Sequence, residues 1–406
     1  MFREPSNRNY ALIIFLILIL VPLNQLPIDI YLPSLPAMTK SFMTTKAMMQ
    51  WTVSAYILGS AIATLLWGPL SDRFGRRKIL LFCLGVFIFS TLGVLWTHRA
   101  ASLLIFRILQ GLGVGGVSTI YFAIIADVFQ GKKLTRVTNY STILYGTVPI
   151  IAPFFGGYIQ HFWGWRANFI LMLIYGLLAF FLYIFLFAET HLNRNTKLLQ
   201  PKILRQNFLR VLKNPVFVGY VICMTLGYAI MITINVIGPF ILQTTLGLTA
   251  TQYGQMILLV GVGYVIGTVL NHHVSKKMNA NPLIFLGNTV VIICGLIMLI
   301  LQLFGIFTIW TVIIPTFFAI LGTGFVFPNG MSQILKIFPA ITGISVAIAA
   351  FLILLGNTII SLLVSLFHVY NIIPLALMNI VLGSCSIIVL WLLVTRKQIA
   401  SGCVKL

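Results

Sequence analysis

The chain has 406 residues, of which 60% are apolar and only 8% carry a charged side chain. Soluble globular domains carry about 25% charged residues, so this composition excludes a water-soluble protein and indicates one embedded in a lipid bilayer. The formal net charge of +21 is spread over short gaps between apolar runs, which argues against a nucleic-acid-binding patch.

The first apolar run covers residues 9–39 and contains one charged side chain, Asp29. About 20 residues of helix, at ~1.5 Å rise per residue, cross a ~30 Å hydrocarbon core, so this run predicts one transmembrane span. No small-residue cleavage site follows its first part, so we interpret the run as an uncleaved helix rather than a signal peptide. An ionisable group inside a span is costly, which makes Asp29 a functional candidate.

Five more runs of one span each follow in the first half of the chain. They cover residues 47–71, 79–98, 100–126, 137–165 and 167–188. Arg107, in the third of these runs, is their only Asp, Glu, Lys or Arg. Counted at ~1.5 Å per residue from the ends of their spans, Asp29 and Arg107 lie at similar depths in the membrane.

The turn between the second and third spans reads Gly68-Pro69-Leu70-Ser71-Asp72-Arg73-Phe74-Gly75-Arg76-Arg77-Lys78. A loop that only fixes topology needs the cations alone. The glycines permit a tight turn with close backbone approach, and Asp72 is placed to pair with a cation or to cap a helix. Asp127 ends the fourth span at the same level, so we expect it to meet Arg76 or Arg73 when the cytoplasmic side is closed.

A basic linker, residues 191–215, separates an N-terminal half (1–190) from a C-terminal half (216–406). Inside it, apolar and basic side chains fall on opposite faces of a helix: Leu204, Phe208, Val211 and Leu212 against Lys202, Arg205, Arg210 and Lys213. This pattern fits a basic amphipathic helix on an anionic leaflet, and a solvated linker fits it equally well.

The second half has three uncharged stretches, residues 214–275, 278–335 and 337–395. A helix of about 60 residues would be about 90 Å long, so each stretch must fold into two spans. We expect the turns near 246–251, 304–307 and 368–371. The sequence therefore predicts an all-α integral membrane protein with twelve transmembrane helices in two six-helix halves.

With twelve spans and a cytoplasmic N-terminus, 21 of the 26 lysines and arginines lie on the cytoplasmic side and four on the other. This split follows the positive-inside rule. We therefore expect a multi-pass protein of the bacterial inner membrane with both termini in the cytoplasm.

The stretch 68–78 resembles the signature loop of the major facilitator superfamily, G-x-x-x-D-R-x-G-R-[RK]. Further motifs follow in family order: residues 106–111 (FRILQG) resemble its R-x-x-Q-G motif, and residues 152–157 (APFFGG) are similar to its antiporter motif G-P-x-x-G-G, with Ala152 for the first glycine. Residues 29–36 (DIYLPSLP) and 324–329 (GFVFPN) resemble the bicyclomycin and chloramphenicol resistance branch of drug/proton antiporters.

This resemblance implies a proton-coupled antiporter that exports small, drug-like molecules. It also implies that spans one and four are neighbours, so an ion pair or an alternating contact between Asp29 and Arg107 is expected, with a static helix lock as the alternative. Of the five carboxylates in the chain, Glu4, Asp72, Asp127 and Glu189 lie in loops or at span ends. Asp29 is therefore the expected proton carrier and Arg107 its modulator.

The remaining candidates fall into three groups. The residues expected to line the substrate cavity are Gln110, Asn235 and Asn329, although each alone fits an interhelical hydrogen bond equally well. The expected cytoplasmic gate comprises Gly68, Asp72, Arg73, Gly75, Arg76 and Asp127, and the antiporter motif contributes Pro153, Gly156 and Gly157.

Other function classes are disfavoured by what the sequence lacks. No G-x-x-x-x-G-K-[ST] stretch is present for an ATP-driven pump. No cluster suits an enzyme active site, and the five cysteines have no metal-binding spacing, so we expect no cofactor or metal. A dedicated exporter of a metabolite or siderophore, a proton-coupled importer and a non-transporting receptor remain as alternatives. The expected partners are a small-molecule substrate, protons and the bilayer, with the protein a monomer.

Overall fold

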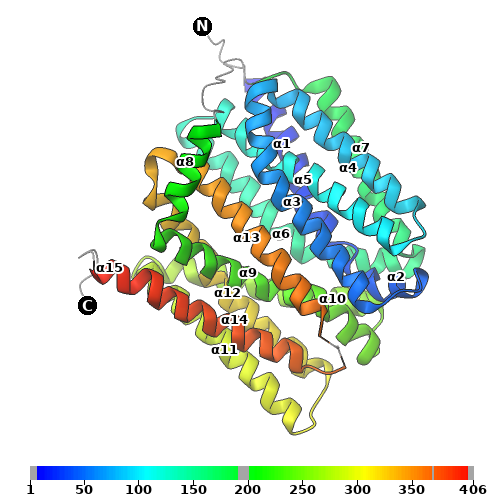
Figure 1. The fold of residues 1–406 in the computed structure, drawn as a ribbon. Helices are drawn as coiled ribbons and strands as arrows, with labels where there is room; N and C mark the ends of the chain where they lie inside the picture. The colour runs from blue at the N-terminus through cyan, green and yellow to red at the C-terminus, as the bar shows by residue number, and fades with distance from the viewer. Residues whose placement is uncertain (1–6, 191–200, 368–369, 401–406) are drawn as a thin grey trace.

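The computed structural model describes residues 7–190, 201–367 and 370–400. All regular structure in these ranges is helical (Figure 1). Twelve helical segments in them are long and apolar enough to cross a membrane, which confirms the predicted number of spans. Helices satisfy their own backbone hydrogen bonds, so they are the structure that such apolar runs adopt in lipid.

The N-terminal half contains the first six spans. They are α1 (Asn7–Asp29) continued by the short η1 (Leu32–Ser34) and α2 (Leu35–Ser41), then α3 (Lys46–Phe74), α4 (Arg76–Trp96), α5 (Ala100–Val128), α6 (Gly131–Trp163) and α7 (Trp165–Leu186). The helix α8 (Pro201–Leu212) follows, and residues 191–200 of the predicted linker lie outside the described residues.

The C-terminal half contains the other six spans. They are α9 (Pro215–Pro239) with the π-helical turn η3 (Phe240–Thr245), α10 (Ala250–Val274), α11 (Ala280–Leu303), α12 (Ile309–Ile337), α13 (Thr342–Ser365) after the short η4 (Pro339–Ile341), and α14 (Ile373–Val389) extended by η5 (Leu390–Thr395) and α15 (Arg396–Ala400).

The three long apolar stretches break where expected. Thr249 and Thr308 each cap the helix that follows, because each side chain accepts a hydrogen bond from the backbone three residues on, and the side chain there bonds back. Such capping boxes satisfy backbone N–H groups that have no partner inside the helix. The third break lies between Ser365 and Ile373, and residues 368–369 of the expected turn lie outside the described residues.

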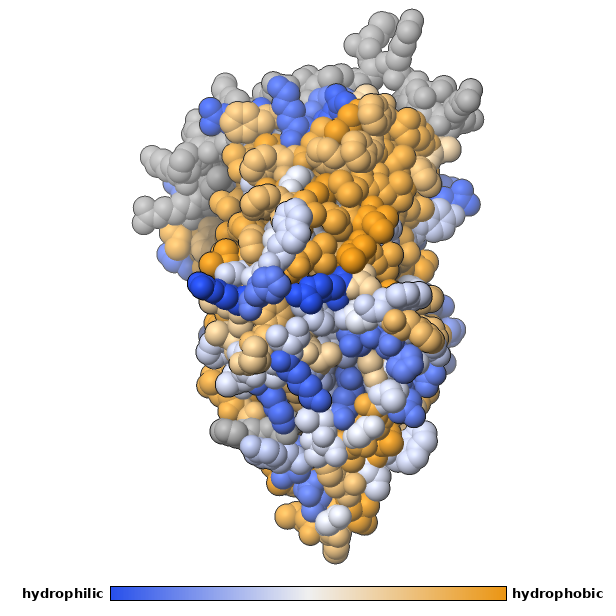
Figure 2. All heavy atoms as spheres, turned by 90° about the vertical axis from the view of Figure 1, so that its right-hand side faces the viewer, coloured by the Kyte–Doolittle hydropathy of each residue, from blue (hydrophilic) through white to orange (hydrophobic). Residues whose placement is uncertain are grey.

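The spans alternate between two faces of the molecule. One face carries the turn between α3 and α4 together with α8 and α15, and we call it the basic face (Figure 1). The opposite face carries α2 and the turn before α10, and we call it the far face. Figure 2 looks onto the far-face end, where polar side chains gather across the middle and lower part while apolar side chains cover the upper part. Large side chains such as Phe185 and Trp163 are 77% and 73% exposed, as a lipid-facing surface requires.

The two halves meet mainly along α3 against α13 and α6 against α10. Several hydrogen bonds between described residues join the halves near the far face. They link Asn235 to Asp29, Gln50 to the Val236 carbonyl, Gln243 to the Pro33 carbonyl, Gln255 to Tyr158, Trp51 to Ser365, and Ser54 to Ser361. All of these residues lie in the far-face half of their spans. The halves are thus closed against each other at the far face.

Of the two interpretations left open for the linker, the structure shows a helix, α8, and packs one side of it on the protein. Val211 is fully buried in a core cluster of the C-terminal half, and Phe208 and Leu212 pack against that cluster. Arg210 and Lys213 are exposed. Protein therefore covers the apolar residues Phe208, Val211 and Leu212, while Arg210, Lys213 and the 44% exposed Leu209 face the surroundings.

Candidate functional site

Asp29 is the last residue of α1, and its carboxyl group is buried, with 3% of the residue exposed. Its Oδ1 accepts a hydrogen bond of 3.1 Å from Nδ2 of Asn235 on α9. Asn235 is also buried, and it lines a small cavity together with Pro149 of α6 and Gly261 of α10. The carboxylate of one half is thus held by an amide of the other half.

Arg107 lies on α5 and is completely buried. Its guanidinium donates to the Pro27 carbonyl at 2.9 Å and to Gln110 Oε1 at 2.8 Å. Pro27 belongs to the last turn of α1, where carbonyls have no partner inside the helix, so Arg107 satisfies one of them. The guanidinium carbon also lies 4.3 Å and 4.6 Å from the ring centroids of Tyr31 and Tyr56, which attract it by cation–π interaction.

The expected ion pair between Asp29 and Arg107 is not formed in this structure. Both ion pairs found between described residues involve Arg76 instead. The two side chains do lie at similar depth, because Arg107 reaches the carbonyl two residues before Asp29. Arg107 instead directs its hydrogen bonds to the Pro27 carbonyl, Gln110 and the Thr52 carbonyl.

Only one of the three expected cavity residues, Asn235, is brought to Asp29. Gln110 lies inside the N-terminal half, where its amide donates to Thr91 Oγ1 at 2.8 Å while its oxygen holds Arg107. Asn329 donates to Asn271 Oδ1 at 2.7 Å, inside the C-terminal half. These two amides therefore fix helices within one half.

Tyrosines from several helices surround the Asp29 region. The Tyr56 hydroxyl donates to the Asn24 carbonyl at 3.1 Å, and Tyr228 interacts with the side chain of Gln25. Asp29 has electrostatic interactions with Tyr56, Tyr145, Tyr228 and Tyr253, which come from α3, α6, α9 and α10. The sequence analysis missed these tyrosines, because nothing in their spacing separates them from lipid-facing aromatic side chains.

The antiporter motif lies where the halves touch. A side chain at Gly156 would collide with the Ile30 carbonyl next to Asp29, and one at Gly157 would collide with the Ala250 carbonyl of α10. Pro153 packs its backbone against Gly254 on α10. The two glycines thus let α6 approach α10 across the interface as well as the end of α1.

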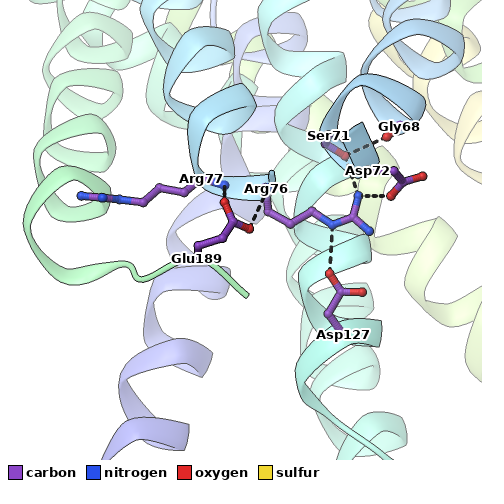
Figure 3. A network of polar contacts seen from close by, with 7 residues as sticks. All are labelled: Gly68, Ser71, Asp72, Arg76, Arg77, Asp127 and Glu189. Atoms are coloured by element: carbon purple, nitrogen blue, oxygen red, sulfur yellow. Dashed lines mark hydrogen bonds and ion pairs between the residues drawn. The ribbon is translucent and has the colours of Figure 1, made fainter. Parts of the chain in front are cut away.

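At the basic face, the Arg76 guanidinium links the ends of three helices (Figure 3). Its Nε donates to Asp127 Oδ2 at 2.9 Å, and its Nη1 donates to Ser71 Oγ at 2.6 Å and pairs with Asp72. The hydroxyl of Ser71 in turn donates to the Gly68 carbonyl at 2.8 Å. The structure thus places Asp127 against Arg76, within the N-terminal half and with the far face closed; it does not test whether the contact depends on closure of the cytoplasmic side. Its role in gating stays a prediction.

Arg73 does not take part in this contact in the same way. Its guanidinium lies over the ring of Phe74, 5.1 Å from the centroid. Of the two arginines considered from the sequence, Arg76 is therefore the one that the structure places against Asp127.

Glu189, at the end of the N-terminal half, caps α4. Its two carboxylate oxygens accept from the backbone N–H groups of Arg76 and Arg77 at 2.9 Å and 3.1 Å (Figure 3). Gly75, with φ of 100°, has no side chain to cap the helix and leaves room for this carboxylate, which a Cβ would strike. The sequence analysis missed Glu189, although a helix that begins Gly-Arg-Arg-Lys without a Ser, Thr, Asp or Asn cap signals a partner from elsewhere.

Comparison with known proteins agrees with this geometry. The sequence matches the model of the Major Facilitator Superfamily over residues 17–361. The chain belongs to this superfamily. It is therefore a multi-pass membrane protein of a family of transporters of small molecules rather than of enzymes.

Several relatives of this superfamily member carry names that refer to drug resistance. A bicyclomycin resistance protein homolog of Haemophilus influenzae is 26% identical over 342 residues, covering 83% of this chain and 85% of that one. Multidrug resistance protein D of Escherichia coli is 24% identical over 355 residues, covering 87% and 88%. Chloramphenicol resistance protein CraA of Acinetobacter baumannii is 26% identical over 277 residues, covering 66% of each.

Solved structures confirm the fold. The xylose transporter XylE from E. coli, in a partially occluded inward open conformation, superimposes with a TM-score of 0.74 over 95% of this chain and 98% of that one. At 17% sequence identity this likeness concerns the major-facilitator architecture of two six-helix halves alone.

Proposed function

We propose that this protein is a proton-coupled antiporter that exports small, drug-like molecules across the bacterial inner membrane. The observation that carries the proposal is Asp29, a buried carboxylate inside a span, bonded to the opposite half through Asn235. Intramembrane carboxylates mark proton pathways in pumps and transporters. The drug-resistance names of the relatives support export as the direction.

In this proposal Asp29 carries the proton and Arg107 modulates it from a fixed position. The charge of Arg107 is anchored on the last turn of α1 and between two tyrosine rings, so it stays in place while the state of Asp29 changes. The membrane potential contributes about 2.3 kcal/mol per charge per 100 mV, which is enough to drive a proton on and off such a site.

The basic face is proposed to be cytoplasmic, together with both termini, because most of the cations expected inside lie there. The halves 1–190 and 216–406 are proposed to rock about the Asp29 region in a monomer, which is how repeat-built transporters alternate access. The network of Arg76, Asp72 and Asp127 is proposed to act as the cytoplasmic gate.

The decisive experiment replaces Asp29 by asparagine, which mimics the protonated carboxyl permanently. We expect Asp29→Asn to lose uphill, pH-dependent efflux of labelled chloramphenicol and of a panel of lipophilic drugs from intact cells, with membrane abundance unchanged. Asn288→Ala is the matched control, because it also removes a buried amide contact but lies on α11, which packs against α12 and α14 of the C-terminal half. Full pH-dependent efflux by Asp29→Asn would refute the proposal.

A further inference from the structure

The bond between Asn235 and Asp29 differs from the other cross-half contacts. Among the far-face hydrogen bonds between the halves that were described above, it is the one that ends on a carboxylate. The others involve neutral amides, hydroxyls, an indole and backbone carbonyls. A change in the charge of Asp29 therefore acts directly on one contact of the far-face closure.

Asn235 is also part of a wider attachment at the end of α9. The next residue, Val236, accepts a hydrogen bond of 2.9 Å from Gln50 on α3 through its carbonyl. Further along, Gln243 donates to the Pro33 carbonyl at 3.0 Å. One segment of the C-terminal half is thus bound at three points to the N-terminal half, and Asn235 provides the point that senses Asp29.

We propose that Asn235 is a positioning residue that holds ionised Asp29 and thereby keeps the far face closed in the empty transporter. This inference rests on the proposed role of Asp29 as proton carrier. A hydrogen bond to an ionised carboxylate is roughly twice as strong as one to a neutral acceptor, so protonation of Asp29 weakens the contact. A substrate group that takes the place of the amide at Asp29 has the same effect.

Such a contact gives an antiporter a property that it needs. If the empty carrier changed state freely, substrate and protons would each run down their gradients without exchange. Because Asn235 holds the unprotonated, unloaded form, only a carrier with a proton or a substrate at Asp29 opens the far face. The equilibrium between the closed and the open far face then depends on how strongly Asn235 binds Asp29 in each protonation state.

The other groups around Asp29 do not duplicate this sensor. Titratable and charged side chains on the neighbouring elements include Tyr31 on the α1–η1 turn, Tyr56 on α3, Arg107 and Tyr121 on α5, Tyr145 on α6, Tyr175 on α7, Tyr228 on α9, and Tyr253 and Tyr264 on α10. The Arg107 guanidinium is bound to the carbonyls of Pro27 and Thr52 and to the side chain of Gln110. Asp29 is the one carboxyl group in this set, so its protonation changes the charge at the contact with Asn235.

The test measures amide hydrogen exchange of the full-length protein in lipid nanodiscs at pH 8 and pH 5, expressed as protection relative to the intrinsic rate. The reporter segments are residues 46–54 of α3 and 361–365 of α13, which carry far-face contacts. In the wild type we expect their protection to fall about tenfold at pH 5, equivalent to about 1.4 kcal/mol. Protection of α11, away from the interface, serves as the internal measure of folding.

The variants distinguish the role of the bond between Asn235 and Asp29 from the role of Asp29 as proton carrier. We expect Asn235→Leu, which keeps the side-chain size, to have low protection at both pH values, and Asp29→Asn to behave alike. Gln243→Ala is the matched control: it removes a cross-half bond of the same helix end but leaves Asp29 untouched, so it should lower protection and keep the pH dependence. If Asn235→Leu loses protection in α11, Asn235→Ser is measured in its place.

Two results would overturn the inference in different ways. Wild-type pH dependence in the Asn235 variants, with the dependence lost in Asp29→Asn, refutes the role of Asn235 and leaves the proton carrier standing. Protection that does not depend on pH in the wild type and is unchanged in Asp29→Asn refutes both the contact and the proposed function of Asp29.

Discussion

The contact between Arg76 and Asp127 offers a quantitative test of the basic-face network. Asp127→Asn keeps the size of the side chain and removes its charge. The two side chains are 7% and 20% exposed and 2.9 Å apart, so the pair is largely but not fully buried. Exposed ion pairs contribute about 0–1 kcal/mol, whereas removing one partner of a buried pair costs about 3–5 kcal/mol. With an amide oxygen still present to accept from Arg76, we expect a loss of about 1–2 kcal/mol.

This loss should appear as slower transport by a protein that still folds. A bias of about 1–2 kcal/mol changes a two-state equilibrium by roughly 5- to 30-fold, so efflux turnover of Asp127→Asn should fall several-fold at equal membrane abundance. The assay is initial efflux of a labelled drug, with thermal unfolding in detergent as the folding control. Arg76→Gln and the double variant complete a mutant cycle, in which the double variant should be no slower than the slower single one. Wild-type turnover of Asp127→Asn, or strictly additive losses, would refute the reasoning.

Three further predictions follow from the fold. Gly75→Ala should lower the unfolding temperature and cost about 1–3 kcal/mol, because it strains a backbone with φ of 100° and displaces the Glu189 carboxylate; an unchanged unfolding temperature contradicts this. Arg107→Lys should abolish most transport although it keeps the charge, because a lysine does not span three acceptors and two rings; efflux at wild-type rate would show that charge alone suffices. A reporter fused to the C-terminus should be active only in the cytoplasm, and periplasmic activity would overturn the proposed orientation.

The number and place of the spans could be predicted because the signal is local. Charged residues are so rare that each uncharged run of span length stands out, and the long runs of the second half break at threonines that cap the next helix. The contact between Arg76 and Asp127 was also accessible, because both residues lie at helix ends on the same face, and counting along the spans places them at one level.

The contacts of Arg107 could not be predicted in the same way. Depth along a helix indicates which residues share a level, and it did so for Asp29 and Arg107. It does not show that the Pro27 and Thr52 carbonyls face the guanidinium, since this depends on how α1 and α3 are rotated about their axes. The partners of Gln110 could not be predicted for the same reason, because its contacts with Thr91 and Arg107 depend on how the helices pack within one half.

The two ends of the connection between the halves are both anchored to protein. Glu189 is fixed on the first turn of α4, and α8 is fixed by Val211 in the core of the other half. Twelve residues of chain at about 3.5 Å each therefore limit the distance between Glu189 and Pro201 to roughly 40 Å. The connection is a linker with a maximum length, which limits how far the basic-face ends of the two halves can separate during a transport cycle. Shortening this linker would therefore restrict the separation of the halves at the basic face without altering a residue of the membrane-embedded site.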